Sequence, residues 1–438
     1  MQIDAGSSLK KVLRPIHIWA IGVGLVISGE YFGWNYGWQA AGTVGFLIAT
    51  LVVTVLYITF IFSFTELTAM IPHAGGPFAY AHRALGPIGG FIAGYATLVE
   101  FLLAPPAIAL ALGSYAHFLH PALPVISTAL ACYVIFTAIN LLGIKESAVF
   151  TLFITILAVG ELLVFTGIVA PHFKTENFLA NAFPLSFKGI FASIPFAIWF
   201  YLAIEGVAMV AEEVKDPQRN IARGYISAIS TLVVLALGVM IFTAGIGDWR
   251  TLSNIDYPLP EAISMVLGKQ SGLTKLFAGI GLFGLIASFH SIILGYSREI
   301  FALARAGYLP SKLADLHPKF KTPHWALIGG GMVGMLAILT RTTGQVITIS
   351  AIGALAMYIV STIAVMILRK KEPGANRPFK TPFYPWFPII ALLLSIMSLF
   401  AVIWFNPKEG VLFFGLLFLF LAIFIGMGKH KPSKEGFI

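Results

Sequence analysis

Long runs of apolar residues, separated by short polar stretches, occupy most of the chain. A helix needs roughly 20 apolar residues to cross the ~30 Å hydrocarbon core of a bilayer. Runs long enough to cross occur at residues 16–37, 41–64, 87–118, 122–142, 148–170, 187–211, 222–246, 273–304, 324–340, 346–368, 387–405 and 410–428. The pattern predicts an all-α, polytopic membrane protein with twelve transmembrane helices and both termini on one side.

Composition and charge support this class of protein. Hydrophobic residues make up 58% of the 438 and charged residues only 11%, which excludes a soluble domain of this length. Most of the 28 Lys and Arg fall in the two tails and the even-numbered loops, so the positive-inside rule predicts that both termini are cytoplasmic. The expected location is the plasma membrane, which in a bacterium is the inner membrane. Topology accounts for the net charge of +9, and we expect no nucleic-acid partner.

The acidic residues inside the apolar runs are the first sign of function. Glu30, Glu100, Glu161 and Glu205 lie deep in predicted spans. An ionised side chain at the bilayer centre costs roughly 2.5 to 3.5 kcal/mol on the mildest scale, so such residues mark functional sites. We expect these carboxyl groups to hold a proton or to meet a cation.

Two spans are poor continuous helices. Gly and Ser crowd around Glu30 in the first span, and Glu205-Gly206 follows Trp199 and Tyr201 in the sixth. Backbone N–H and C=O groups without helical hydrogen bonds are tolerated in a membrane only where they line a cavity. For the first span, close helix packing through small residues is an alternative explanation of the Gly and Ser. Interrupted helices in corresponding positions of two halves indicate a transporter site at the repeat interface.

The predicted organisation has two five-helix repeats of inverted topology. These repeats span residues 16–170 and 187–368, and the last two helices, 387–428, lie outside them. Residues 1–15 and 429–438 are expected to be cytoplasmic segments. The loops at 65–86 and 212–223 are expected near the inner mouth, and the segment 247–272 is a candidate outer lid.

Four stretches of the chain resemble the amino acid-polyamine-organocation transporters. They are residues 27–29, residues 66–67 with 72–80, residues 205–220, and residues 297–310. Residues 29–35 and 100–106, with sequences GEYFGWN and EFLLAPP, resemble the ethanolamine permeases within this group. The resemblance implies a leucine-transporter-type fold with broken helices 1 and 6 around a central site.

The resemblance also implies the residues of that site. Amino acid carriers of the group use a Gly-x-Gly in the first helix to bind a substrate carboxylate, but here Ile27 replaces the first Gly and Glu30 follows the second. Both departures favour an amine without a carboxylate, because Glu30 would repel an acid group. The expected substrate-binding residues are Ser28, Gly29, Glu30, Glu100, Trp199, Tyr201, Ala203 and Glu205.

Ion coupling is left open by the sequence. Glu161 stands where proton-coupled relatives have a Lys, so three roles remain: holding a proton, helping to bind sodium, or a structural role. Ser288, Ser291 and His290 of the eighth span are further candidates. We expect no cofactor, and the sequence gives no confident metal site.

The function expected from the sequence is secondary transport of a small organic cation, with ethanolamine as the favoured substrate. The alternatives are a proton- or sodium-coupled amino acid permease and an amine sensor that does not transport. An enzyme is not expected, because no span or loop assembles a nucleophile, metal or phosphate motif. The oligomeric state stays open.

Overall fold

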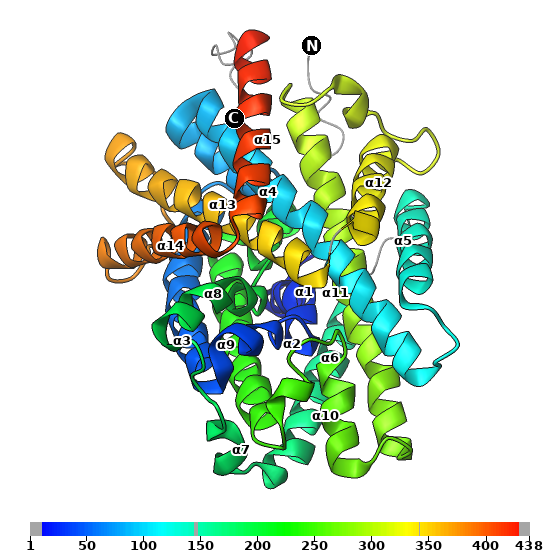
Figure 1. The fold of residues 1–438 in the computed structure, drawn as a ribbon. Helices are drawn as coiled ribbons and strands as arrows, with labels where there is room; N and C mark the ends of the chain where they lie inside the picture. The colour runs from blue at the N-terminus through cyan, green and yellow to red at the C-terminus, as the bar shows by residue number, and fades with distance from the viewer. Residues whose placement is uncertain (1–10, 144–147, 341, 429–438) are drawn as a thin grey trace.

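The computed structural model of the chain describes residues 11–143, 148–340 and 342–428. Its regular structure in these ranges is helical, apart from one β-bridge between Leu13 and Val214. Long helices cross one another through the centre of the molecule, and the short helices α7 and α10 lie together at the lower end in Figure 1.

The helices follow the apolar runs of the sequence closely. In the first half they are α1 (Pro15–Val26), α2 (Ser28–Tyr31), α3 (Tyr36–Met70), α4 (Gly76–Leu119), α5 (Val125–Leu141), α6 (Ala148–Val169), α7 (Thr175–Leu179), α8 (Ser186–Trp199) and the 3₁₀-helix η2 (Ile204–Glu213). In the second half they are α9 (Pro217–Ala244), α10 (Pro258–Leu267), α11 (Gly272–Arg305), α12 (His324–Thr340), α13 (Thr343–Lys371), α14 (Trp386–Phe405) and α15 (Pro407–Gly426). Short 3₁₀ turns lie at Ala170–His172, Trp249–Thr251 and Ser311–Ala314.

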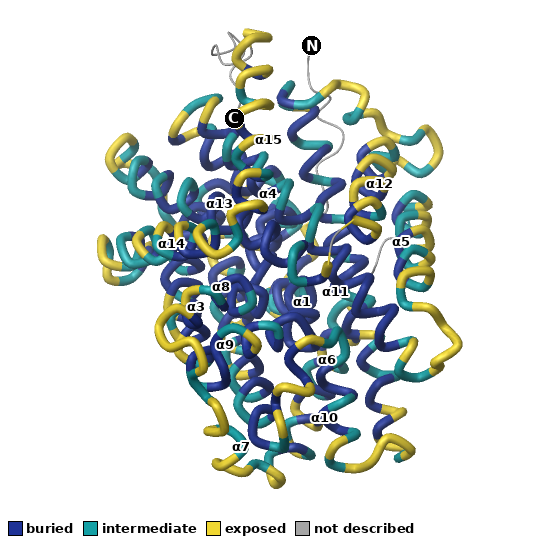
Figure 2. The backbone as a smooth tube through the Cα atoms, in the orientation of Figure 1, coloured by how far each residue is buried: buried dark blue, intermediate teal, exposed yellow. Residues whose placement is uncertain are grey.

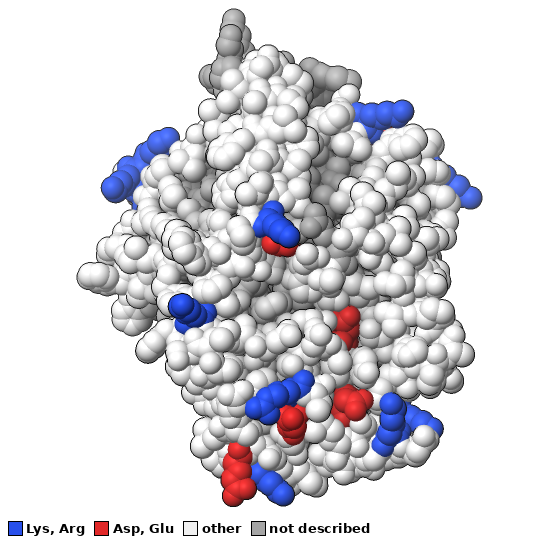
Figure 3. Space-filling view, viewed as in Figure 1, with Lys and Arg blue, Asp and Glu red and all other residues white. Residues whose placement is uncertain are grey.

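The exterior of the helix bundle is suited to lipid. Within the described residues, nine helices are long and apolar enough to cross a membrane, and α1, α5, α10 and α12 are shorter apolar helices. The outer helices α14 and α15 expose large apolar side chains, with Trp404 70% and Val411 73% exposed. On the face drawn in Figure 3, charged side chains are sparse, and most of the surface between the two ends is uncharged. The chain is therefore a multi-pass membrane protein.

The first interrupted segment lies at the centre of the bundle. α1 ends at Val26, and α2 runs for one turn from Ser28 before the backbone becomes extended at Phe32 and enters the left-handed region at Gly33, where φ is 91°. α1 packs against α6, α9, α11 and η2, and its tube is buried in Figure 2. The Gly-rich sequence around Glu30 therefore produces a short, broken helix inside the protein.

The second interrupted segment faces the first. α8 ends at Trp199, and the chain turns through Ala203, whose φ is 74°, before η2 begins. The sequence drew attention to Glu205-Gly206, but the left-handed residue is Ala203. Gly206 serves close packing, because an added Cβ would lie 3.0 Å from both Leu25 and Phe101.

The predicted loop at residues 65–86 is wrong over most of its length. α3 continues to Met70 and α4 begins at Gly76, with a change of direction at Gly86, where φ is 76°. Gly76 and Pro77 suggested a loop. Pro is nevertheless compatible with the first turn of a helix, because backbone N–H groups in that turn have no intrahelical acceptor and Pro therefore loses no bond. Only residues 71–75 connect the two helices.

A buried ion cluster ties the ends of α3 and α13 to the following loop. Glu66 is 1% exposed and accepts two hydrogen bonds from Arg369, at 2.8 and 2.6 Å. Arg377 approaches the same carboxylate at 3.4 Å, and the backbone N–H and hydroxyl of Thr381 both donate to it at 2.8 Å. Five donors on one carboxylate make this end of the bundle rigid.

The last two residues of η2, Glu212 and Glu213, have different partners from those expected. The sequence suggested that Glu212 or Glu213 pairs with Arg219 or Arg223. In the structure the Ala74 backbone N–H donates to Glu212 at 2.9 Å, and Glu213 faces Arg298 at 3.8 Å. These contacts join η2 to the α3–α4 connection and to α11, because α11 brings its Arg298 to the same end of the bundle.

The close approach of the two interrupted segments predicts a strong effect of Gly29→Ala. An added Cβ would collide with the carbonyl oxygen of Trp199, whereas a Cβ at Gly167 on α6 would meet nothing within 4 Å. We expect Gly29→Ala to lower the yield of folded protein or its transport rate at least tenfold, and Gly167→Ala to leave both unchanged. Size-exclusion profiles and uptake rates of the two variants check this, and a normal Gly29→Ala protein would contradict the packing described here.

The Glu66 cluster predicts unequal effects of two acid deletions. Removing one partner of a buried ion pair costs about 3 to 5 kcal/mol, whereas exposed pairs contribute about 0 to 1 kcal/mol. Glu66→Ala should therefore lower the thermal midpoint much more than Glu372→Ala, whose partner Arg83 is 34% exposed and holds the pKa of the Glu372 carboxyl below its usual value. Equal midpoints for the two variants in thermal unfolding of the detergent-solubilised protein would refute the role given to Glu66.

Candidate functional site

The two interrupted segments touch where Gly29 and Gly33, in the segment that carries Glu30, pack against Trp199. Glu30 is fully buried, and neither carboxyl oxygen has a hydrogen-bond partner among the described residues. The Trp199 ring lies directly against Gly33, with Phe32 packed edge-on at 5.6 Å between ring centroids. The indole Nε1 of Trp199 also lacks a partner in the described part of the chain. Unpaired polar atoms at this depth are costly, so this location is suited to a polar ligand.

Glu100 and Glu205 form a second acidic location. Glu100 comes from α4 and Glu205 from the start of η2, and their carboxyl groups lie within hydrogen-bonding reach of each other. Both residues are fully buried. The Ala203 N–H donates to Glu100 Oε1 at 3.1 Å, so the left-handed turn at Ala203 aims its backbone at this pair. The sequence expected Glu100 and Glu205 near one site, and the structure brings them together.

Tyrosine hydroxyls connect the acids to α3 and α13. Tyr358 on α13 donates to Glu205 Oε2 at 3.3 Å, and the hydroxyls of Tyr57 and Tyr358 are 2.8 Å apart. Tyr201, a predicted site residue, packs against Tyr57 with ring centroids 5.0 Å apart and the rings tilted by 45°, and its hydroxyl is 2.7 Å from the Thr54 hydroxyl. Sequence reasoning missed Tyr57 and Tyr358 because each is a single Tyr in an apolar span, and no spacing relates them to Glu205.

Glu161 is held by the first interrupted segment. The Tyr31 hydroxyl donates to Glu161 Oε2 at 2.7 Å, and the backbone oxygen of Tyr31 accepts a bond from Tyr115 at 3.1 Å. Glu161 Oε1 has no partner among the described residues. Glu161 therefore lies next to the segment that carries Glu30, and its role in ion coupling stays a prediction.

The other ion-coupling candidates lie at different places on α11. Ser288 and Ser28 hydroxyls are 2.8 Å apart, and Ser288 donates to the Leu25 carbonyl oxygen at 2.6 Å. Ser291 is only half-buried. His290 faces α5, where its Nδ1 is 3.1 Å from the Asn140 side chain. Ser288 thus contacts the break in helix α1–α2, whereas His290 belongs to the interface with α5.

A further buried acid was missed by the sequence reasoning. Glu299 on α11 is 1% exposed, and both of its oxygens lack hydrogen-bond partners among the described residues. Glu299 offers a useful comparison for the acids of the site, because it is equally buried and stands outside both acidic locations.

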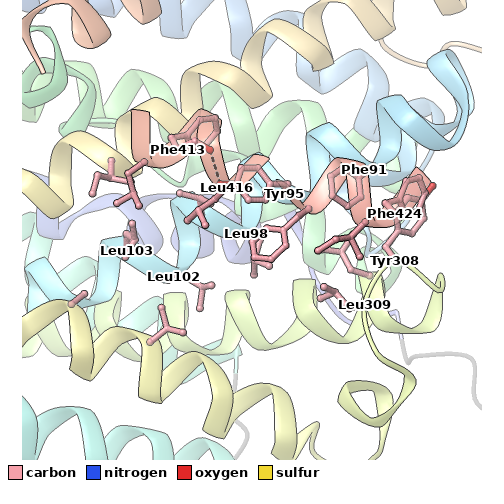
Figure 4. A pocket seen from close by; sticks show the side chains of 18 of the residues that line it. Phe91, Tyr95, Leu98, Leu102, Leu103, Tyr308, Leu309, Phe413, Leu416 and Phe424 are labelled. Carbon is pink, nitrogen blue, oxygen red and sulfur yellow. Dashed lines mark hydrogen bonds between the residues drawn. The ribbon is translucent and has the colours of Figure 1, made fainter. Parts of the chain in front are cut away.

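One open cavity of the bundle has the wrong chemistry for a cation. It measures about 750 Å³ and lies between α4, α11, α12, α13 and α15 (Figure 4). Its lining is apolar except for two Tyr and one Thr. The hydroxyl of one of these, Tyr95, already donates a hydrogen bond to the Phe413 carbonyl oxygen at 2.9 Å. Nothing in this lining could neutralise an ammonium group, so the buried acids are the better candidate site.

The candidate lid is fastened over one end of the interrupted segments. Asn35 donates to the carbonyl oxygens of Leu252 and Ile255, at 2.6 and 2.8 Å. The Asp256 carboxylate accepts bonds from Tyr36 at 2.7 Å and from Thr343 at 2.9 Å. The segment around residues 252–256 is therefore joined to the start of α3 and the start of α13.

These features define a class of protein. The bundle is built for a bilayer, two broken helices meet at its centre, and buried polar groups without partners gather around them. Broken helices at the bilayer midplane are the usual binding sites of secondary transporters. In the described residues, no cluster of three or more His, Cys, Asp or Glu could hold a metal ion.

Comparison with known proteins identifies the family. Residues 13–428 match the amino acid permease family, so the chain belongs to this family of transporters. An uncharacterized transporter of Rhizobium meliloti is 31% identical over 90% of this chain and 87% of its own length. A branched-chain amino acid permease of Bacillus subtilis is 27% identical over 98% of this chain and 95% of its own, and a methylthioribose transporter of the same organism is 28% identical over 90% and 89%.

The Tyr31–Glu161 contact can be tested by a double-mutant cycle. A buried hydrogen bond to a charged group contributes about 1.5 to 3 kcal/mol, and the same bond is removed by Tyr31→Phe and by Glu161→Gln when the amide replaces the acceptor poorly. Because a Gln oxygen can still accept from Tyr31, the cycle also uses Glu161→Leu, which has no acceptor. Tyr31→Phe and Glu161→Leu should each lower the thermal midpoint, and the double variant should lower it by less than the sum of the two. Additive effects in the same unfolding measurement would show that the two side chains act independently.

Proposed function

We propose that this protein is a secondary active transporter that imports a small organic cation by alternating access, with ethanolamine as its substrate. The observation that carries the proposal is Glu30, a fully buried acid with two unpartnered carboxyl oxygens beside an interrupted helix. Such a group attracts an ammonium and repels a carboxylate, which favours an amine without an acid group.

Trp199 supplies the second half of the proposed amine site. Its ring lies against Gly33 in the segment that contains Glu30, and a cation over an indole face gains about 0.5 to 2 kcal/mol. Ser28, Gly29, Tyr201 and Ala203 complete the proposed binding surface with hydroxyl and backbone groups. The Glu100–Glu205 pair adds negative charge to the same central region.

The proposed architecture has twelve transmembrane helices and two inverted five-helix repeats. In this assignment, α1 with α2 and α8 with η2 are the equivalent broken helices, and α14 and α15 lie outside the repeats. Support comes from the positions of the two interruptions, which begin after Val26 and after Trp199. Cytoplasmic termini follow from the distribution of Lys and Arg in the sequence. The inside-negative potential would then favour entry of a monocation by about 2.3 kcal/mol per 100 mV.

A second candidate is an amino acid permease coupled to protons or sodium. The branched-chain amino acid permease of Bacillus subtilis favours it, because it aligns with 98% of this chain. The two functions differ in a simple way: an amino acid permease must accept a carboxylate next to Glu30. Competition between substrates with and without a carboxylate therefore separates the two candidates.

The test is uptake of labelled ethanolamine into proteoliposomes with unlabelled ethanolamine, choline, alanine and leucine as competitors. We expect ethanolamine to compete and alanine and leucine to have no effect. Inhibition by alanine or leucine would establish the amino acid permease, and tight ethanolamine binding without accumulation would establish an amine sensor.

The contribution of Glu30 is tested by Glu30→Gln with Glu299→Gln as the matched control. Both are fully buried acids without hydrogen-bond partners in the described residues, but only Glu30 lies in the segment whose Gly29 and Gly33 pack against Trp199. Loss of the charge should raise the KM for ethanolamine at least tenfold, equivalent to about 1.4 kcal/mol, whereas Glu299→Gln should change it less than twofold. Equal KM values for Glu30→Gln and the wild type would show that Glu30 does not bind the substrate.

A further inference from the structure

The apolar cavity of about 750 Å³ has α12 and α15 on its two sides, and we call it the α12–α15 groove. In Figure 4, Leu103 of α4 and Tyr308, which follows α11, lie at opposite ends of it. Its rims are open, because Leu336 of α12 is 60% exposed and Ile423 of α15 is 47% exposed. The groove is therefore continuous with the lipid-facing surface of this membrane protein.

The polar groups in the groove are already satisfied by the protein. The hydroxyls of Tyr95, Tyr308 and Thr340 each donate to a backbone carbonyl oxygen, at 2.9, 3.2 and 2.8 Å. The other described residues of the lining are apolar. Because these three donors are in use, water or a polar ligand would lose hydrogen bonds on entering the groove. The chemistry of the lining therefore fits a hydrocarbon chain.

The length of the groove matches one leaflet of a bilayer. α15 lines it from Leu412 to Phe424, which is about 18 Å of helix at a rise of ~1.5 Å per residue. One leaflet contributes about half of the ~30 Å hydrocarbon core. A lipid acyl chain can therefore lie in the groove over the full depth of its leaflet.

Basic residues surround the end of the groove at which Tyr308 lies. Residues 305–321 carry four Lys and Arg but one Asp. Arg305 and Lys312 are exposed, and the Lys312 ammonium lies over the ring of Trp325 at 4.7 Å, where α12 begins. Trp is enriched at the edge of a membrane, and basic clusters on the cytoplasmic side attract anionic lipid headgroups. The charge at this end is complementary to an anionic phospholipid.

The groove lies behind the part of α4 that carries Glu100. Leu98, Val99, Leu102 and Leu103 face the groove. Glu100, on the same two turns of the helix, is fully buried in the bundle. Whatever fills the groove therefore packs on the outer face of a helix that carries an acid of the candidate site.

α4 needs support in this segment. Pro105 and Pro106 lie inside the helix and cannot donate hydrogen bonds to the carbonyl oxygens one turn earlier, which weakens the helix there. On one side, Gly353 of α13 packs against the backbone of α4, because an added Cβ would lie 2.9 Å from the Glu100 nitrogen. On the side of the groove, the support comes from the occupant of the groove.

We propose that the α12–α15 groove binds one acyl chain of an anionic phospholipid of the inner leaflet, with the headgroup at Arg305 and Lys312. The bound lipid supports the segment of α4 that carries Glu100. The choice of leaflet rests on the proposed cytoplasmic termini, whereas the site itself is independent of the transported substrate.

The experiment measures the lipid that stays bound to the purified full-length protein. The protein is reconstituted with equal amounts of dioleoyl phosphatidylglycerol and dioleoyl phosphatidylcholine and extracted in detergent, and the retained lipids are counted by native mass spectrometry. We expect one phosphatidylglycerol per chain, retained at least fivefold over phosphatidylcholine. Retention of the two lipids in equal amounts, or of neither, would overturn the proposal.

Two pairs of variants locate the lipid. Leu336→Trp fills the groove, and Leu339→Trp is its control, because both residues lie on α12 with 60% and 63% exposure but only Leu336 lines the groove. Leu336→Trp should lower the retained lipid at least fivefold, and Leu339→Trp should leave it unchanged. Lys312→Gln should remove the preference for phosphatidylglycerol, whereas Lys408→Gln, at the far end of α15, should keep it. Unchanged retention in both Leu336→Trp and Lys312→Gln would show that the lipid binds elsewhere.

Uptake into proteoliposomes tests the support given to α4. Labelled ethanolamine, alanine and leucine are supplied separately, so that whichever is transported reports on the lipid. Replacing phosphatidylglycerol by phosphatidylcholine should lower the wild-type rate at least threefold, and an unchanged rate would refute the supporting role. A dimer that retains no lipid and that Leu336→Trp dissociates would show that a second copy fills the groove. Failure of ethanolamine uptake with phosphatidylglycerol still retained would overturn the proposed substrate and leave the lipid site supported.

Discussion

The burial of carboxyl groups without basic partners is the constraint on which this protein depends. Inside a membrane, an ionised acid is stable only next to a cation or strong donors. Glu66 meets this requirement with two Arg and with Thr381, and it fastens one end of the bundle. Glu30 has no hydrogen-bond partner among the described residues, and Glu100 and Glu205 each keep one oxygen without a partner there.

The same constraint explains why the helices are broken where they are. Backbone groups released by an interruption need partners, and the protein supplies them within the site: the Ala203 N–H bonds Glu100, and the Tyr31 carbonyl accepts from Tyr115. Glycine at position 29 permits the contact, since the Trp199 carbonyl occupies the space of a side chain. Close packing and binding chemistry thus come from the same few residues.

Glu30, Glu100 and Glu205 were expected around one substrate. In the structure Glu100 and Glu205 form a pair between α4 and η2, and Glu30 lies in the interrupted segment whose Gly33 packs against Trp199. Membership of the amino acid permease family establishes transport as the general activity.

The sequence by itself determined the helical class, nearly all helix positions and four of the buried acids, because the length of an apolar run and the cost of a charge inside it can be read from the local sequence. It also located both interruptions, although it took residues 65–86 for a loop and missed Glu299. Only the tertiary structure decided which acids lie together. Glu100 and Glu205 are 105 positions apart, and their separation along the sequence does not predict that they are neighbours. The partners Tyr57, Tyr358 and Tyr31 come from three different helices, and their hydroxyls acquire a role only when packing brings them to the carboxyl groups.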